Sequence, residues 1–153
     1  MTPAIKVAEK HKITFKVHQY KHDKKHASYG LEAAEKMNVD AQQVFKTLVV
    51  EVDKQLVVAV LPVTEQLNLK AVASALKGKK AQMADKNDVL RSSGYVLGGV
   101  SPLGQKKRLT TLIDSTATDH PDIYVSAGKR GLEIQLKAQD LADMLSAEFV
   151  ALT

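Results

Sequence analysis

Val44-Phe45-Lys46-Thr47-Leu48-Val49-Val50-Glu51-Val52 is the strongest strand signal in the chain, because it is rich in β-branched and aromatic residues. A second apolar run follows at residues 55–63. Asp53 and Lys54 separate the two runs, and a two-residue link of this kind predicts a β-hairpin, although the glycine that favours such turns is missing. The hairpin is therefore the starting point for the predicted fold.

Lys46 lies on an apolar face of the first strand. Alternate residues of a strand share a face, so Lys46 points the same way as Val44, Leu48 and Val50. One interpretation is that its aliphatic stem lies along the apolar surface while the ammonium group reaches solvent. The other is that partial burial lowers the pKa of the lysine and suits it to chemistry or to binding an anion. The pattern alone favours the first interpretation, since most lysines are solvated.

Caps and periodicity divide the rest of the chain into helices and strands. Helices are predicted at residues 3–12, 28–37, 69–77, 85–92 and 138–146, with a short helical turn from residue 40. Their predicted N-caps are Thr2, Ser28, Asn68 and Asp85, and two of their predicted stops are Asn38 and Gly78. Further strands are predicted at residues 13–20, 82–84, 108–114, 123–126 and 132–136, with an edge strand at 148–152. This order predicts a mixed α/β domain around one sheet.

Length and composition predict one domain spanning residues 1–153. Hydrophobic residues make up 44% and charged residues 25%, which is typical of a globular protein, and no run is long enough to predict a membrane span. The N-terminus lacks a signal-peptide core, so we expect a cytoplasmic protein. The absence of cysteine excludes a disulfide, a thiolate metal site and a cysteine nucleophile belonging to the protein.

The net charge of +5 suits an anionic partner such as nucleic acid, a nucleotide or an acidic protein. Basic residues gather in four groups beside predicted turns, at residues 21–26, 77–80, 106–108 and 129–130. Each group alone is typical of a solvated loop, whereas four groups on one rim would attract a phosphate backbone.

Motifs for metal and nucleophilic chemistry are weak. His22 and His26 have the spacing of two ligands on one helical face, but the surrounding lysines oppose a divalent cation, and we predict no metal and no cofactor. Ser28, Ser101 and Ser126 lie outside the Gly-x-Ser-x-Gly pattern, and we assign no protein general base.

Two glycine segments carry the remaining signal. Gly98-Gly99-Val100-Ser101-Pro102 and Ser126-Ala127-Gly128-Lys129-Arg130-Gly131 both follow predicted elements, where backbone N–H groups can converge on a carbonyl or phosphate oxygen. The alternative is that both segments are simply tight turns.

Four segments together resemble the YbaK/EbsC family of aminoacyl-tRNA deacylases, which includes the editing domain of bacterial prolyl-tRNA synthetases. They are His26-Ala27-Ser28-Tyr29-Gly30-Leu31-Glu32-Ala33-Ala34, Val44-Phe45-Lys46-Thr47-Leu48-Val49, Gly94-Tyr95-Val96-Leu97-Gly98-Gly99-Val100-Ser101-Pro102-Leu103-Gly104 and Ser126-Ala127-Gly128-Lys129-Arg130-Gly131-Leu132-Glu133-Ile134. The chain is most similar to the free-standing YbaK type, which removes cysteine wrongly attached to proline tRNA. The resemblance implies a mixed, barrel-like sheet flanked by helices, with a small pocket for the aminoacyl group and the terminal adenosine.

The resemblance also implies which residues form the pocket. Lys46 and Tyr20 take the positions of the central lysine and the pocket tyrosine, and we expect both to serve catalysis. The expected substrate-binding residues are Tyr29, Thr47, Gly98, Gly99, Ser101, Pro102, Ser126, Gly128 and Glu133. The family often has Asp where this chain has Glu133, and the extra methylene changes the reach of the carboxylate.

The family's chemistry explains why no nucleophile is evident. In the YbaK type the thiol of the substrate is thought to attack its own ester, so the protein needs only to position the ester and stabilise charge. The expected partners are the acceptor end of tRNA(Pro) and prolyl-tRNA synthetase. Two alternatives stay open: a deacylase that prefers Ala- or Ser-tRNA, and a module without turnover that binds tRNA or the synthetase.

Overall fold

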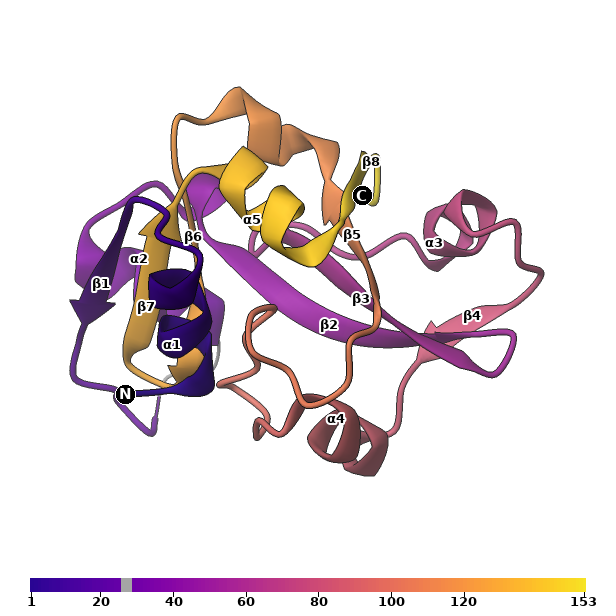
Figure 1. Ribbon diagram of the computed structural model, residues 1–153, viewed down its shortest axis with the longest axis horizontal. Coiled ribbons are helices and arrows are strands. Elements are labelled where there is room, and N and C mark those ends of the chain that lie inside the picture. The colour runs from indigo at the N-terminus through magenta and orange to yellow at the C-terminus, as the bar shows by residue number, and fades with distance from the viewer. Residues whose placement is uncertain (26–28) are drawn as a thin grey trace.

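The computed structural model describes residues 1–25 and 29–153, and the predicted hairpin lies at its centre (Figure 1). Strand β2 (Phe45–Val52) pairs along its whole length with antiparallel β3 (Gln55–Pro62). Asp53 and Lys54 have φ angles of 47° and 72°, as a type I′ turn requires, so the hairpin is confirmed without a glycine. The Asp53 carboxylate accepts hydrogen bonds from the backbone N–H groups of Lys79 and Lys80, at 2.8 and 2.9 Å, which stabilise this turn.

The hairpin belongs to a five-stranded sheet with the order β4-β2-β3-β5-β8. In this sheet β4 (Ala81–Met83) is antiparallel to β2, whereas β5 (Thr110–Asp114) is parallel to β3 and β8 (Glu148–Val150) is parallel to β5. The predicted edge strand at the C-terminal end is therefore confirmed. A second sheet contains three antiparallel strands, β1 (Phe15–Gln19), β7 (Leu132–Leu136) and β6 (Ile123–Lys129), in that order.

Two sheets replace the one sheet that the sequence predicted. In the described part of the chain, the β-bridge between the two sheets is an isolated parallel one that joins Val44, just before β2, to Tyr124 of β6. From Val50 onward the second edge of β2 pairs with β4, and β6 bulges between Ser126 and Lys129, so the two strands do not continue as neighbours. The expectation of mixed strands flanked by helices is confirmed, but the strands do not close into a barrel.

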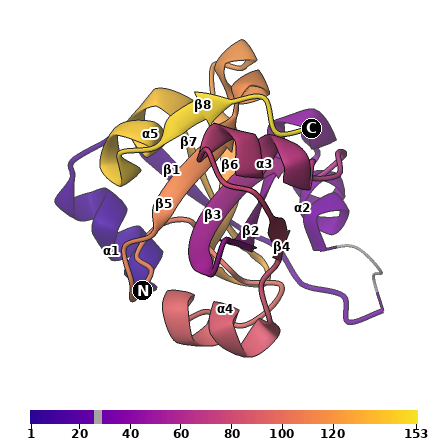
Figure 2. The same ribbon diagram turned by 90° about the vertical axis from the view of Figure 1, so that its right-hand side faces the viewer.

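Five α-helices surround the sheets in the described part of the chain: α1 (Pro3–Lys10), α2 (Tyr29–Met37), α3 (Leu69–Ala75), α4 (Lys86–Ser93) and α5 (Ala138–Leu145). Short 3₁₀ turns η1 (Ala41–Gln43) and η2 (Ser115–Asp119) complete the order. In Figures 1 and 2, α4 lies below the hairpin and α3 and α5 lie above it. No described helix has both the length and the apolar character needed to cross a membrane.

The predicted caps can be compared with the structure one by one. Thr2, Asn68 and Asp85 cap α1, α3 and α4 through their side-chain oxygens, as predicted. The predicted cap Ser28 lies outside the described residues. The predicted stop at Gly78 is wrong by one residue, because Lys77 takes the left-handed conformation with φ 55° and the Gly78 N–H then bonds to the Ala73 carbonyl.

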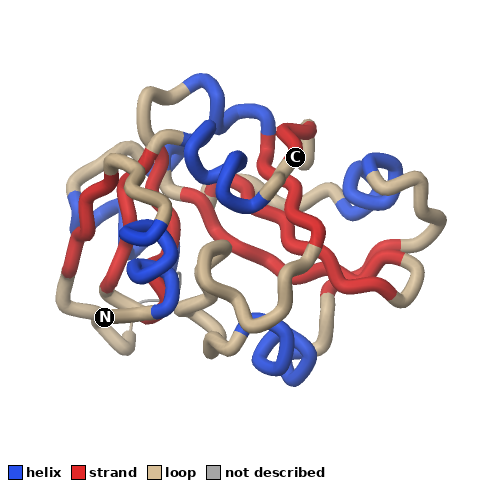
Figure 3. Tube along the Cα trace, in the orientation of Figure 1, coloured by secondary structure: helices blue, strands red, loops and turns tan. Residues whose placement is uncertain are grey.

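The main core leaves one face of the small sheet free for a site. Alternate residues of β6 and β7 enter the core, among them Val125 and Ile134, together with Leu141 of α5. Ser126 and Glu133 are their chain neighbours and lie opposite each other in register, so they project from the other face. In Figure 3 the loop after α4 passes close to the small sheet.

Candidate functional site

A pocket of about 450 Å³ lies between the two sheets, beyond the point where β2 and β6 meet. Its lining comes from β2, the start of α2, the loop after α4, the end of β3 and the small sheet: Tyr20, Tyr29, Gly30, Lys46, Thr47, Leu48, Val63, Leu97, Gly98, Val100, Ser126, Arg130 and Glu133. This volume lies in the range of small-ligand sites.

Seven of the residues expected in the site line this pocket, namely Tyr20, Tyr29, Lys46, Thr47, Gly98, Ser126 and Glu133. The other four, Gly99, Ser101, Pro102 and Gly128, lie outside the lining. Residues from positions 20 to 133 of the chain are thus brought around one cavity.

The four residues outside the lining shape the loops around the pocket. A Cβ atom at Gly99 would lie 2.8 Å from Lys129 Cα, so the two glycine segments pack directly against each other. The Ser101 hydroxyl accepts a hydrogen bond from Leu103 N–H, and Pro102 lines a separate cavity of about 230 Å³. Gly128 has φ 108° and donates its N–H to the Ser126 hydroxyl at 3.1 Å. Their glycine and serine chemistry therefore acts on the loop backbone.

Lys46 presents an ammonium group to the pocket without a carboxylate to neutralise it. Burial lowers the pKa of Lys46, and the negative charge of Glu65 partly opposes this effect. Within residues 1–25 and 29–153, Lys46 forms no ion pair within 4.0 Å. A partly buried stem and a pocket-facing charge combine both interpretations of the sequence.

Thr47, the next residue of β2, also lines the pocket, and its hydroxyl has no hydrogen-bond partner among the described residues. In the described part of the chain, Thr47 Oγ1 is the one buried side-chain oxygen or nitrogen that lacks a hydrogen bond. Such a group is destabilising by about 1 to 3 kcal/mol unless a ligand satisfies it. Thr47 is therefore a ready donor or acceptor for a bound molecule.

Glu133 brings a buried carboxyl group to the opposite side of the pocket. The residue is 6% exposed, and burial raises its pKa from 4.5 to about 8. Burial also raises the pKa of Tyr20 to about 12, with further increases from the negative charges of Glu133 and Glu32. At neutral pH Tyr20 is thus a neutral hydrogen-bond donor, and Glu133 holds a proton that a bound cation would displace.

Arg130 is the pocket residue that sequence reasoning assigned only to a basic group. Its guanidinium carbon lies 3.5 Å from the centre of the Tyr29 ring. Gly98 has φ 86°, which favours glycine, and a Cβ atom there would lie 2.3 Å from Arg130 Nε, so the loop approaches this side chain closely. Gly30, Leu48, Val63, Leu97 and Val100 also line the pocket and were not predicted as site residues. A prediction that the two glycine segments pack against each other could have identified Arg130 as a pocket residue.

The histidines do not form a metal centre among the described residues. No group of three or more His, Asp or Glu side chains there could hold a metal ion. His22 instead contacts Glu32 and Arg130, while its proposed companion His26 lies outside the described residues.

Known proteins resemble this chain in sequence. Residues 25–144 match the aminoacyl-tRNA editing domain family. A protein of Enterococcus faecalis named EbsC, described as a candidate Cys-tRNA(Pro)/Cys-tRNA(Cys) deacylase, is 35% identical over 99% of this chain and 93% of its own length. The proline–tRNA ligase of Shouchella clausii is 36% identical over 49% of this chain and 13% of the ligase.

A solved structure shares the fold. It is described as a candidate trans-editing enzyme for prolyl-tRNA synthetase and superposes with a TM-score of 0.87, covering 99% of this chain and 94% of that protein at 19% identity.

Proposed function

The chain belongs to the aminoacyl-tRNA editing domain family, and we propose that it is a trans-editing deacylase that hydrolyses the ester of cysteine misattached to tRNA(Pro). The observation that carries this proposal is a pocket of about 450 Å³ lined by Lys46, which forms no ion pair among the described residues, and by Thr47, whose hydroxyl has no hydrogen-bond partner there. We propose that residues 1–153 act as one editing domain in the cytoplasm, where aminoacyl-tRNA is used.

The pocket suits a reaction in which the substrate supplies the nucleophile. Its lining includes the hydroxyl groups of Thr47 and Ser126 but no histidine that could activate them. In the proposed reaction the cysteinyl thiol loses its proton and its sulfur attacks its own ester carbonyl, the C–O bond to the ribose breaks, and the ribose oxygen takes a proton and leaves as a hydroxyl group. Water then opens the resulting cyclic thioester to give free cysteine. The protein then contributes orientation and charge stabilisation.

Each polar group of the pocket has a proposed role. Lys46 stabilises the negative charge that develops on the ester oxygens, and Thr47 donates to the same region. The Glu133 carboxylate pairs with the protonated α-amino group of the substrate, because a cation beside this carboxyl favours its charged form. Tyr20 lines the pocket as a neutral hydrogen-bond donor. Ser126 and the backbone at Gly98 line the space for the aminoacyl group.

The acceptor end of tRNA(Pro) is the proposed ligand, and prolyl-tRNA synthetase is the proposed partner. Support comes from the names of the relatives, which refer to Cys-tRNA(Pro) and to prolyl-tRNA synthetase. Basic side chains bind phosphates without regard to sequence, so a synthetase partner would supply the choice of tRNA.

A deacylase that prefers seryl- or alanyl-tRNA is the second candidate. The free Thr47 hydroxyl favours serine in particular, since it could pair with a seryl hydroxyl. Small side chains are separated by only about 1 to 3 kcal/mol in an apolar pocket, so a single contact can change the preference.

Deacylation of tRNA(Pro) charged with Cys, Ala, Ser or Pro tests these candidates. The account predicts rapid release of cysteine and at least a roughly hundredfold loss of rate in Lys46→Ala. Faster release of serine or alanine would favour the second candidate. Absence of hydrolysis with all four substrates, or full activity in Lys46→Ala, would contradict the proposal.

A further inference from the structure

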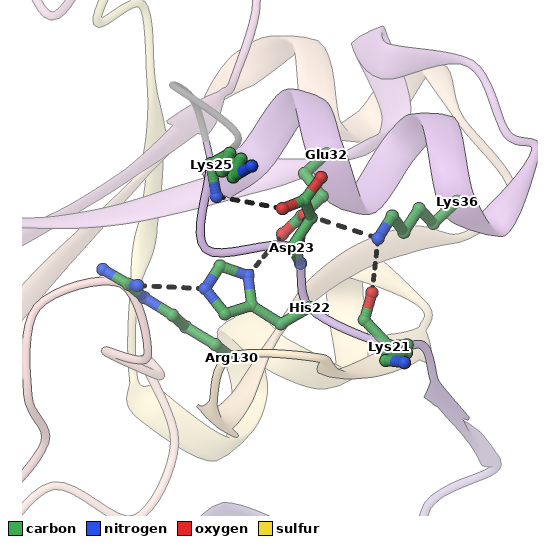
Figure 4. Close-up of polar contacts among 7 residues, drawn as sticks. All are labelled: Lys21, His22, Asp23, Lys25, Glu32, Lys36 and Arg130. Atoms are coloured by element: carbon green, nitrogen blue, oxygen red, sulfur yellow. Dashed lines mark hydrogen bonds and ion pairs between the residues drawn. The ribbon is translucent and has the colours of Figure 1, made fainter.

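Arg130 lines the pocket, and Figure 4 shows its guanidinium group in contact with His22. It stacks over Tyr29 at 3.5 Å, and Arg130 Nη1 donates to His22 Nε2 at 3.0 Å. Gly98 leaves the space that Arg130 Nε occupies. A free arginine side chain has large rotamer entropy, so these contacts make the group preorganised for binding.

The charge of Arg130 is not neutralised. Among residues 1–25 and 29–153, Arg130 makes one hydrogen bond, to His22, and lies within 4.0 Å of no carboxylate. Arg91, by contrast, pairs with Asp88 on the surface of α4. The planar guanidinium retains N–H groups that match two oxygens of a phosphate. Its position therefore suits an anionic part of the ligand.

The contact with Arg130 determines the tautomer of His22. Arginine can only donate hydrogen bonds, so His22 Nε2 must accept and the ring proton must lie on Nδ1. Nδ1 lies 2.7 Å from Glu32 Oε1, which accepts this proton. Glu32 thus fixes both the orientation and the tautomer of the imidazole.

Several contacts hold the Glu32 side chain in position beside His22. Its side chain is fully buried and accepts a further hydrogen bond from Asp23 N–H at 2.8 Å, with Lys36 Nζ at 3.6 Å. Burial alone raises the pKa of Glu32, but the hydrogen bonds from His22 and Asp23 and the charge of Lys36 outweigh it, so the pKa lies below its ordinary value. The carboxylate is therefore charged when His22 contacts it.

We propose that Glu32 and His22 form a relay that positions Arg130 to bind the 3′-terminal phosphodiester of the aminoacylated RNA. The proposal rests on the deacylase function and assigns Arg130 to phosphate binding, with His22 and Glu32 as positioning residues. Lys46, which also lines the pocket, then remains available for the ester. The bound group is a phosphodiester within an RNA chain, and a free phosphate ion is the other source of the same chemistry.

Steady-state kinetics on two substrates tests the relay. Cysteinyl-tRNA(Pro) contains the terminal phosphodiester, whereas the cysteinyl ester of adenosine has no phosphate. Arg130→Ala should raise KM for the charged tRNA about tenfold with kcat changed less than about twofold, because a charge-assisted hydrogen bond is lost. His22→Ala should raise KM about threefold to fivefold for the same substrate, because the arginine loses its orientation.

Neither variant should alter KM for the adenosine ester. His22→Gln should restore most of the wild-type KM, because its amide can accept from Arg130 and donate to Glu32. Arg91→Ala removes the same charge far from the pocket and His11→Ala removes an exposed histidine, so both should behave as wild type. A wild-type KM in His22→Ala, or equal losses on both substrates, would overturn the relay.

Binding of an uncharged acceptor-stem RNA hairpin separates this proposal from the deacylase function. Arg130→Ala and His22→Ala should weaken binding, Arg91→Ala should not, and inorganic phosphate at low millimolar concentration and constant ionic strength should leave wild-type binding unchanged. Competition by phosphate at low millimolar concentration, or unchanged binding in Arg130→Ala, would overturn the assignment. A wild-type protein that binds the hairpin but releases no amino acid would contradict the deacylase function alone.

Discussion

Two buried glutamates, Glu133 in the pocket lining and Glu32 behind His22, have opposite chemical surroundings. Glu32 is surrounded by hydrogen-bond donors and a lysine, and its pKa is lowered despite its burial. Glu133 has no such partner in the described structure, and burial raises its pKa to about 8. A carboxylate with internal partners organises the protein, whereas one without partners is available to a ligand.

The pH dependence of stability should distinguish the two groups most strongly. The unfolded chain releases the Glu133 proton near pH 4.5, whereas the native state holds it until about pH 8. The free energy of unfolding should therefore fall as pH rises through this window. The expected loss across this window is on the order of 5 kcal/mol. Glu133→Gln should abolish it, as urea unfolding at several pH values would show. Equal pH slopes in both proteins would contradict this prediction.

Glu32 should affect the pH dependence of stability in the opposite direction to Glu133, and Glu32→Gln tests this. A lowered pKa stabilises the fold above the ordinary value of 4.5, and this contribution is lost as pH falls through the lower native value. At neutral pH the variant should therefore lose about 1 to 3 kcal/mol, because donors from His22 and Asp23 lose a charged acceptor. The same unfolding series measures this loss. A variant as stable as the wild type at pH 7 would show that the paired carboxylate has no organising role.

Thr47→Val should produce the smallest stability change and sharpen the same comparison. The substitution removes an unpaired buried hydroxyl, so the free energy of unfolding should rise by up to about 1 kcal/mol. Deacylation should nevertheless slow, because the ligand loses a donor. Lower stability, or undiminished activity, would argue that Thr47 serves the fold and not the ligand. Thr111→Val on β5, whose hydroxyl bonds to the Leu109 carbonyl, is the matched control and should be destabilising.

Local signals in the sequence predicted most elements correctly. Alternation in residues 44–52 and the two-residue link predicted the hairpin, and the side chains of Thr2, Asn68 and Asp85 predicted three helix starts. The division into two sheets was not predictable, because it depends on β4 taking the edge of β2 and on a bulge in β6. Such pairing is long-range and leaves no periodic trace in either strand.

Lys46 stands out against its own strand, but that pattern alone favoured a solvated lysine, and the site residues were predicted from the family resemblance. Arg130 and His22 were harder to identify, since basic residues in turns are usually solvated and their contact joins residues 108 positions apart. Gly98 was an indirect sign of this contact, because its φ of 86° and the nearby Arg130 side chain both favour glycine at this position. The local pattern therefore predicted the pocket's framework better than its charged rim.

Hydrolysis of S-methylcysteinyl-tRNA(Pro) beside cysteinyl-tRNA(Pro) tests the central claim most directly. The methyl group blocks the thiol and leaves the ester, the α-amino group and the tRNA intact. If the substrate supplies the nucleophile, the methylated substrate should bind as a competitive inhibitor of cysteine release and should not be hydrolysed above the uncatalysed rate. Hydrolysis of both substrates at similar rates would contradict the account and assign the attack to water or to a group of the protein.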